Sequence, residues 1–270
     1  GMSGLIAAAN AVAAEDDRTP EGIRRKQAAA LRAKEDPERR RMVALADAWA
    51  SAFLAEKKKG DAPEIVDRFY AMRDGASSGL SDPAPDLTTS DIAPAARRFL
   101  HWELAFPERA RAGGMFDVVI GNPPYLRGKD HAQADPRGRA FASWRYPACT
   151  GSQWNLYVPF IMLAARLSRR RSALIVQSSV LGAQYAGAIH ESLLSSNGIL
   201  AVLDFSKVPN LFSGAAVQVA SLVVSRDPSL KTEFLRFGVV HDRALEIGEP
   251  AERLGIADMV DEERDHRVFT

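Results

Sequence analysis

The segment Asn122-Pro123-Pro124-Tyr125 has residue types and spacing that suit chemistry on a planar group. The asparagine side chain offers one carbonyl acceptor and two N–H donors. Each proline fixes its own φ angle, biases the residue before it towards extended geometry and has no N–H group. The tyrosine offers a flat ring for stacking. Together they form a rigid pair of acceptors beside a stacking surface, which suits a planar group bearing an NH2, such as the exocyclic amine of adenine.

Two acceptors at such an amine would draw its lone pair out of conjugation and make the nitrogen a nucleophile. This chemistry needs no general base with a shifted pKa. A base in duplex DNA would have to leave the stack to reach the pocket. The structural alternative is a Pro-Pro turn after a strand, with Tyr125 packing nearby. We favour the functional interpretation because the motif follows the glycine that ends an apolar run.

Other catalytic chemistries fit the sequence less well. The histidines show no metal-ligand spacing; they are His101, His131, His190, His241 and His266. A single cysteine, Cys149, excludes an internal disulfide and a cysteine-cluster metal site. The chain has no Gly-x-Ser-x-Gly elbow and no phosphate-cradling loop. We therefore expect no metal site.

The elements that would position the motif alternate between strands and helices. Phe116–Gly121 is predicted to be a strand, and residues 126–151 a long loop. Further strands are expected at 172–181, 199–206, 217–225 and 232–240, with helices at 155–170 and 184–198. Strands that are apolar on both faces indicate a sheet covered by helices on both sides. Ligands of such sheets bind at the carboxyl ends of strands, where Asn122 lies.

The first 92 residues have a different character. Helical periodicity predicts helices at 20–35 and 38–58, separated by Pro37, and a further helix at 63–73. A loop at 74–91 and a short helix around 93–104 follow. We expect three regions: a helical N-terminal region (1–92), an α/β domain (93–226) and a C-terminal extension (227–270). Basic side chains outnumber acidic ones nine to four from Arg18 to Arg41, which fits a solvated helix face better than a phosphate-binding surface.

The single cysteine, Cys149, fits a protein of the reducing cytoplasm. The net charge of +1 does not favour polyanion binding by the whole molecule. The N-terminal run is apolar, but it lacks a basic start and becomes acidic, so it is a poor secretory signal. No apolar run approaches the ~20 residues that span a membrane.

The segment FDVVIGNPPY resembles motif IV of the S-adenosylmethionine-dependent amino-methyltransferases, above all the N6-adenine DNA methyltransferases of restriction-modification and phage-defence systems. The resemblance extends over residues 99–225. It includes FLHWELAFPE before the motif, NLYVPFIMLAARLSRRRSALIVQSSVL after it, and NLFSGAAVQVASLVVS. It implies an α/β fold with a partial Rossmann-like methyltransferase sheet, S-adenosylmethionine as cofactor and DNA as partner.

The resemblance also implies roles for individual residues. Asn122 and the carbonyl of Pro123 would accept hydrogen bonds from the target amine, with Pro124 completing the rigid motif. Asn122 would also border the cofactor. Tyr125 would stack on the flipped base and Phe212 would pack on its other face or edge. Phe160 would touch the adenine ring of the cofactor, although an apolar residue on a predicted core helix is equally well explained by packing.

Two departures from the family pattern stand out. The family has a glycine-rich cofactor loop after its first strand. The only candidate upstream of the motif, residues 75–79, follows a charged helix instead of a strand, and no helix is predicted to begin after it. Arg169-Arg170-Arg171 replaces the usual Pro-Gly-Gly turn. We expect these arginines to form an exposed turn, although they could meet phosphate.

Three hypotheses therefore remain open. The first is an adenine-N6 DNA methyltransferase module, completed by a missing upstream segment or a second chain. The second uses the same pocket for a protein glutamine or a base in RNA. The third is a non-catalytic subunit that binds DNA or a partner. Because the glycine loop is missing, we expect the chain on its own to be weakly active or inactive.

Overall fold

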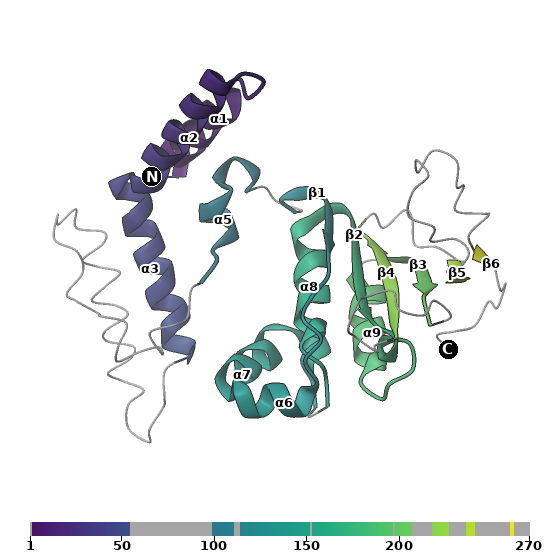
Figure 1. Ribbon diagram of the computed structural model, residues 1–270. Coiled ribbons are helices and arrows are strands. Elements are labelled where there is room, and N and C mark those ends of the chain that lie inside the picture. Colours follow the sequence, from purple (N-terminus) through teal and green to yellow (C-terminus); the bar gives the residue numbers. More distant parts are fainter. Residues whose placement is uncertain are drawn as a thin grey trace, which may run out of the picture. The chain divides into compact units, whose positions relative to one another are not determined.

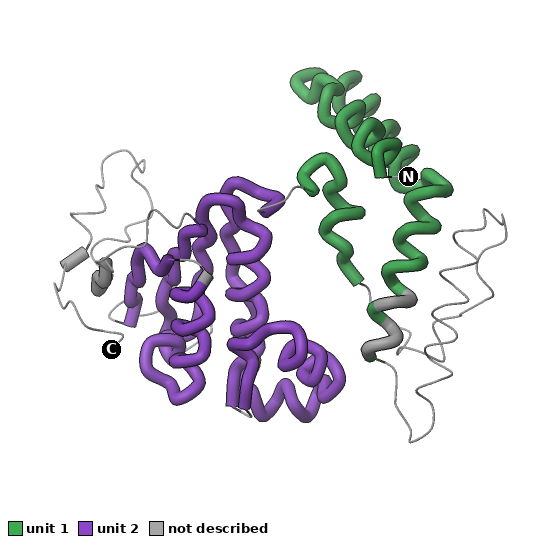
Figure 2. Tube along the Cα trace, turned by 180° about the vertical axis from the view of Figure 1, so that it is seen from behind, with its two compact units in different colours: residues 1–111 green, residues 112–270 purple. Residues whose placement is uncertain are grey.

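A computed structural model of the protein describes residues 2–54, 99–110, 114–151, 153–196, 198–206, 218–226, 236–240 and 260–261. The chain divides into two compact units, Gly1–Arg111 and Ala112–Thr270 (Figure 2). Within the described residues no helix combines the length and the apolar character needed to cross a membrane.

Unit 1 is helical. Its elements are α1 (Met2–Ala14), α2 (Pro20–Glu35), α3 (Pro37–Leu54), α5 (Trp102–Ala105) and the 3-10 turn η1 (Pro107–Arg109). The predicted helix at 20–35 is confirmed, and α3 confirms the second as far as residue 54. The prediction did not include α1. Of the predicted helix at 93–104, residues 102–104 are helical and residues 99–101 are not, while residues 93–98 lie outside the described residues.

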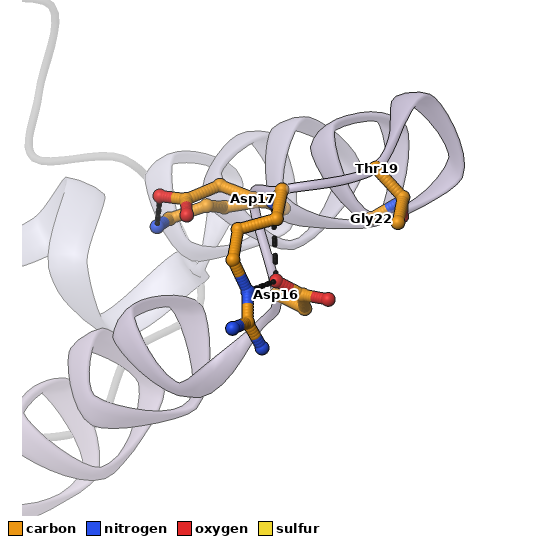
Figure 3. Close-up of polar contacts among 6 residues, drawn as sticks. Asp16, Asp17, Thr19 and Gly22 are labelled. Carbon is orange, nitrogen blue, oxygen red and sulfur yellow. Dashed lines mark hydrogen bonds and ion pairs between the residues drawn. The ribbon is translucent and has the colours of Figure 1, made fainter.

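The start of α2 shows why that helix was predictable. Thr19 is extended, and its hydroxyl accepts a hydrogen bond from the backbone N–H of Gly22 at 3.0 Å (Figure 3). Pro20 occupies the first helical position, where its missing N–H costs nothing. Asp17 pairs with Lys26 across the turn at 2.7 Å. Local residue types alone therefore define this helix end.

Unit 2 is an α/β sheet (Figure 1). Its strands are β1 (Phe116–Gly121), β2 (Ser168–Gln177), β3 (Gly198–Asp204), β4 (Val219–Ser225), β5 (Arg236–Val240) and β6 (Val260–Asp261). Its helices are α6 (Gly128–Ala134), α7 (Pro136–Arg145), α8 (Tyr157–Leu167) and α9 (Ala186–Ser196), with 3-10 turns η2 (Pro147–Cys149) and η3 (Ser178–Val180).

The strand order of this sheet is β1-β2-β4-β3-β5-β6. β1 and β2 are parallel, and β4 runs antiparallel to both β2 and β3. The predicted α/β class is confirmed: a partly parallel sheet with helices, preceded in the chain by a helical region.

The core of unit 2 lies on one face of this sheet. Leu174, Leu222 and Val202 are register partners across β2, β4 and β3, and all three are buried. They belong to one apolar cluster with α8 and α9. The neighbouring register row, Ala173, Val223 and Ala201, faces the other way and is only half-buried. The described helices that pack on the sheet, α8 and α9, thus cover a single face.

Two predictions about the connections were wrong. Residues 126–151 are not a loop but contain α6 and α7. Asp135 explains part of this, because its carboxylate accepts from the Gly138 N–H at 2.8 Å and caps α7. The three arginines are exposed as expected, but they lie inside β2 rather than in a turn. The helix before them ends at Leu167, and Ser168 already pairs with Phe116 of β1.

Gly114 makes this close junction possible. Its φ of +120° is a conformation that other residues rarely adopt, and a Cβ there would lie 2.6 Å from the Ser168 carbonyl oxygen. The next residue, Met115, donates its N–H to the Leu167 carbonyl at 2.8 Å. The chain is therefore fixed against the end of α8 directly before β1 begins.

Candidate active site

The Asn-Pro-Pro-Tyr motif lies at the carboxyl end of β1, as predicted. Asn122 and Pro124 are exposed, Pro123 is buried and Tyr125 is half-buried. The buried proline holds the backbone against the protein while the asparagine side chain stays accessible. Strand β1 thus presents an amide at the sheet edge where α/β folds bind ligands.

Tyr125 is anchored at its hydroxyl. The O–H donates to the carbonyl of Ile175 in β2 at 3.0 Å. Burial raises the pKa of Tyr125 above its usual value, so the hydroxyl is neutral at physiological pH. The anchored hydroxyl fixes the direction of the ring axis and holds the ring beside the motif, where it can serve as a stacking surface. Because the hydroxyl already donates its proton to the Ile175 carbonyl, Tyr125 is not placed to act as an acid or base.

The loop after the motif is held at two points. The N–H of Leu156 donates to the Leu126 carbonyl at 2.9 Å. The N–H of Gly128 donates to the Asn155 side-chain oxygen, also at 2.9 Å. A Cβ on Gly128 would lie 2.4 Å from the Trp154 carbonyl oxygen, so only glycine permits this approach. The segment before α8 therefore fixes where the motif loop ends.

Asn155 connects this loop to the end of β2. Besides accepting from Gly128, its amide nitrogen donates to Gln177 Oε1 at 2.8 Å and to the Tyr185 hydroxyl at 3.1 Å. The prediction had not assigned a role to Asn155 or Gln177. The available signal was a polar residue shortly before an apolar helix, and another at the end of an apolar strand.

Three hydroxyl groups continue the network. The Tyr157 and Tyr185 oxygens lie 2.6 Å apart, and each lies 3.1 Å from Ser179 Oγ. Burial is the main cause that raises the pKa of Tyr157 far above its usual value. The described contacts of this network comprise amides, hydroxyls and backbone groups, so it is uncharged.

The helical pair α6–α7 packs on Trp154. The Arg139 guanidinium lies 3.9 Å from the Trp154 ring centroid and donates to the Trp154 carbonyl at 3.1 Å. The His131 ring meets the same indole edge-on, with centroids 5.6 Å apart. Burial, with help from Arg139, lowers the pKa of His131. These contacts explain why a polar segment folds into helices beside the motif.

The remaining predicted site residues differ in how far the structure places them. Phe160 lies in the first turn of α8 and is 40% exposed, so it is not a core residue. Phe212 and the glycine-containing segment 75–79 lie outside the described residues. In the described part of the chain, no group of three His, Cys, Asp or Glu side chains could hold a metal ion.

A comparison with protein families identifies the chain. The model of the Eco57I restriction-modification methylase family matches residues 67–212, more than half of the chain. The chain belongs to this family. The match includes the Asn-Pro-Pro-Tyr motif, Asn155, Gln177 and Phe212, and it confirms the resemblance drawn from the sequence. No curated protein matches this Eco57I-family chain.

Solved structures that match part of this chain include other restriction-modification enzymes. The Type IIL enzyme MmeI, in complex with DNA, is 19% identical over 45% of this chain and 16% of its own, with a TM-score of 0.36. The M protein of the type I enzyme EcoKI is 13% identical over 46% of this chain and 25% of its own, with a TM-score of 0.31. A Listeria monocytogenes protein described as a class I S-adenosylmethionine-dependent methyltransferase is 14% identical over 84% and 74%, with a TM-score of 0.39. The Eco57I-family chain thus spans a quarter or less of the first two enzymes.

Proposed function

We propose that this chain is the motif-bearing half of an S-adenosylmethionine-dependent methyltransferase that acts on adenine N6 in DNA, in a restriction-modification or phage-defence system. The observation that carries the proposal is the exposed amide of Asn122 at the carboxyl end of β1, beside the anchored ring of Tyr125. Family membership supports the methyltransferase class. A DNA substrate is consistent with a cytoplasmic protein.

In the proposed mechanism the residues act by geometry rather than by charge. Asn122 Oδ1 and the Pro123 carbonyl accept hydrogen bonds from the two N–H groups of the target amine, and the rigid Pro124 keeps both acceptors in place. Tyr125 stacks on the extruded base, and the hydrogen bond from its hydroxyl to the Ile175 carbonyl keeps the ring at the site. Phe212 packs against the same base.

The family implies S-adenosylmethionine, which supplies a methyl group on a positively charged sulfur. The residues present fit one side of this cofactor. Phe160 offers an exposed apolar ring for the adenine moiety, and Asn122 borders the same edge of the sheet. The uncharged network behind the motif adds no cation that would repel the sulfonium.

The shape of the described sheet supports completion by a further segment or a second chain. Strand β1 is an edge strand, pairing on one side with β2, and the described residues contain no strand on its other side. Its apolar side chains Val118 and Ile120 are 57% and 77% exposed. An apolar, unpaired edge strand is a site for further pairing. We expect the missing half to supply the cofactor loop, and the chain alone to transfer methyl groups weakly or not at all.

Cofactor binding tests this proposal directly. We would titrate the purified chain with S-adenosylhomocysteine by calorimetry and compare two variants, Phe160→Ala and Leu194→Ala. Both residues are exposed apolar side chains, but Leu194 lies on α9, outside the candidate site. Binding that is weakened at least about fivefold by Phe160→Ala alone supports the proposal, since burying such a ring stabilises by about 1–3 kcal/mol.

The other results point to other functions. Binding that is equally strong in both variants would remove Phe160 from the site. No binding would mean that this chain holds only half of the cofactor site, and the titration would be repeated with the upstream segment or partner that supplies the rest. If the cofactor binds, transfer of a labelled methyl group to DNA, RNA or protein glutamine separates the remaining hypotheses, and N6-methyladenine is the product we expect.

A further inference from the structure

We propose that Gln177 is a specificity-determining residue of the candidate active site: its Nε2 group, left available because Asn155 binds the side-chain oxygen, donates a hydrogen bond to a ring nitrogen beside the target amine. This inference rests on the proposed function and adds to it a donor that recognises the base. It follows from a chain of contacts in which each amide orientation is fixed by the one before.

The orientation of Asn155 is fixed by the backbone. The N–H of Gly128 can only donate, so the group facing it at 2.9 Å must be the Asn155 oxygen and not the amide nitrogen. The Asn155 nitrogen therefore faces Gln177 and Tyr185, at 2.8 Å and 3.1 Å. All three hydrogen bonds of this side chain agree with one orientation.

The orientation of Gln177 follows from that of Asn155. Because the Asn155 nitrogen donates, the atom that it meets must be the Gln177 oxygen. The two N–H donors of Gln177 then point away from Asn155, and they have no hydrogen-bond partner among the described residues. Gln177 is half-buried. Partly buried donors left without a protein partner are destabilising unless water or a ligand takes them up.

Gln177 lies beside the motif. It is the last residue of β2, two residues after Ile175, whose carbonyl holds the Tyr125 hydroxyl. Through Asn155 it is also linked to Gly128, at the other end of the motif loop. The segment from Tyr125 to Gly128 is thus fixed at both ends by groups next to Gln177.

The chemistry of the two sets of groups is complementary to one edge of adenine. Asn122 and Pro123 supply acceptors for an amine, and Gln177 supplies a donor. Adenine presents its amine next to an acceptor ring nitrogen on either side, N1 on the pairing edge and N7 on the other. Thymine has no amine to offer.

The test uses nuclear magnetic resonance of the 270-residue chain with deoxyadenosine as the probe at millimolar concentration, together with its 1-deaza and 7-deaza analogues. The variant Gln177→Glu keeps the oxygen that accepts from Asn155 and removes the donor. In the wild type we expect saturable shifts of the Asn122 and Gln177 side-chain amides, and about tenfold weaker binding of one deaza analogue, the size of one hydrogen bond. In Gln177→Glu this discrimination between analogues should disappear.

A second variant tests the positioning role. Asn155→Asp keeps the acceptor for Gly128 but loses the donor to Gln177, so it should also lose the discrimination while the Gly128 N–H stays protected from hydrogen exchange. Shifts at Asn122 with discrimination that persists in Gln177→Glu would overturn this inference and leave the proposed function standing. No saturable shift at Asn122 would contradict both.

Discussion

The two faces of the sheet in unit 2 differ in how far other elements of the chain cover them. On one face, Leu174, Leu222 and Val202 are buried under α8 and α9. On the other, Ala173 and Val223 are half-buried and Ile120, in the edge strand, is largely exposed. The side chains are apolar on both faces, as in sheets covered on two sides. The comparison indicates that the sequence encodes a two-sided sheet of which this chain, in its described part, supplies one covering layer.

Thiol labelling should show the largest difference between the covered and the open side. Cys149 is fully buried in the core cluster, and burial raises the pKa of its thiol to about 12. A cysteine at Ile120 (Ile120→Cys in a Cys149→Ala background) should react with a thiol reagent at least about a thousandfold faster at neutral pH. Reaction of Cys149 needs an opening that approaches global unfolding. Similar rates would mean that the edge of β1 is covered or that the core opens readily.

Adjacent valines in β4 allow a matched comparison of the two faces. Val224 is buried on the covered face, whereas Val223 is half-buried on the other. Val224→Ala should lower the free energy of unfolding by ~2 kcal/mol through lost burial and the cavity left behind. Val223→Ala should lower it by less than ~1 kcal/mol. Urea denaturation measures both; equal losses would show that residues outside the described part cover the second face.

Two histidines with lowered pKa values should also make the free energy of unfolding depend on pH. Burial lowers the pKa of both His131 and His190. The unfolded chain, with histidine pKa values of about 6.5, then binds more protons than the folded chain as the pH falls through that value. Stability should be constant above about pH 7.5 and decrease as the pH falls below about 6.5. Urea midpoints at pH 7.5 and 5.5 measure this, and an unchanged difference in a His190→Leu variant would exclude His190 as a source.

The smallest effect on stability is expected at the open edge. Ile120→Lys should change the free energy of unfolding by less than ~0.5 kcal/mol, because the side chain it replaces is already exposed. A lysine on an edge strand also opposes pairing with other strands, so any self-association seen by sedimentation should decrease. A large loss of stability would mean that Ile120 is packed against residues outside the described part.

Local signals predicted some elements well, while contacts distant in the sequence decided the others. A threonine cap and Pro20 define the start of α2, and an apolar run ending in Gly121 places Asn122 at the end of a strand. By contrast, α6 and α7 depend on Arg139 and His131 packing on Trp154, a contact that their polar composition conceals. A helix cap at Asp135 followed by Pro136 was the signal available in the sequence.

The candidate site likewise contains one part that local sequence predicts and one part that depends on contacts distant in the sequence. The motif residues follow one another in the chain, so their chemistry could be inferred from residue types and their place from one strand. The network behind them joins Asn155 to Gln177 and Tyr185, which are 22 and 30 residues away. No local pattern specifies these hydrogen bonds, because they depend on where β2 ends relative to α8.

The strand order has a consequence for synthesis of the chain on the ribosome. β3 does not pair with β2, which precedes it, but with β4 and β5, which are made later. A nascent chain that ends before Val219 therefore contains β3 without either partner, although the parallel pair β1 and β2 is complete. We expect the apolar residues of β3 to need protection from aggregation until β4 emerges and inserts between the two halves of the sheet.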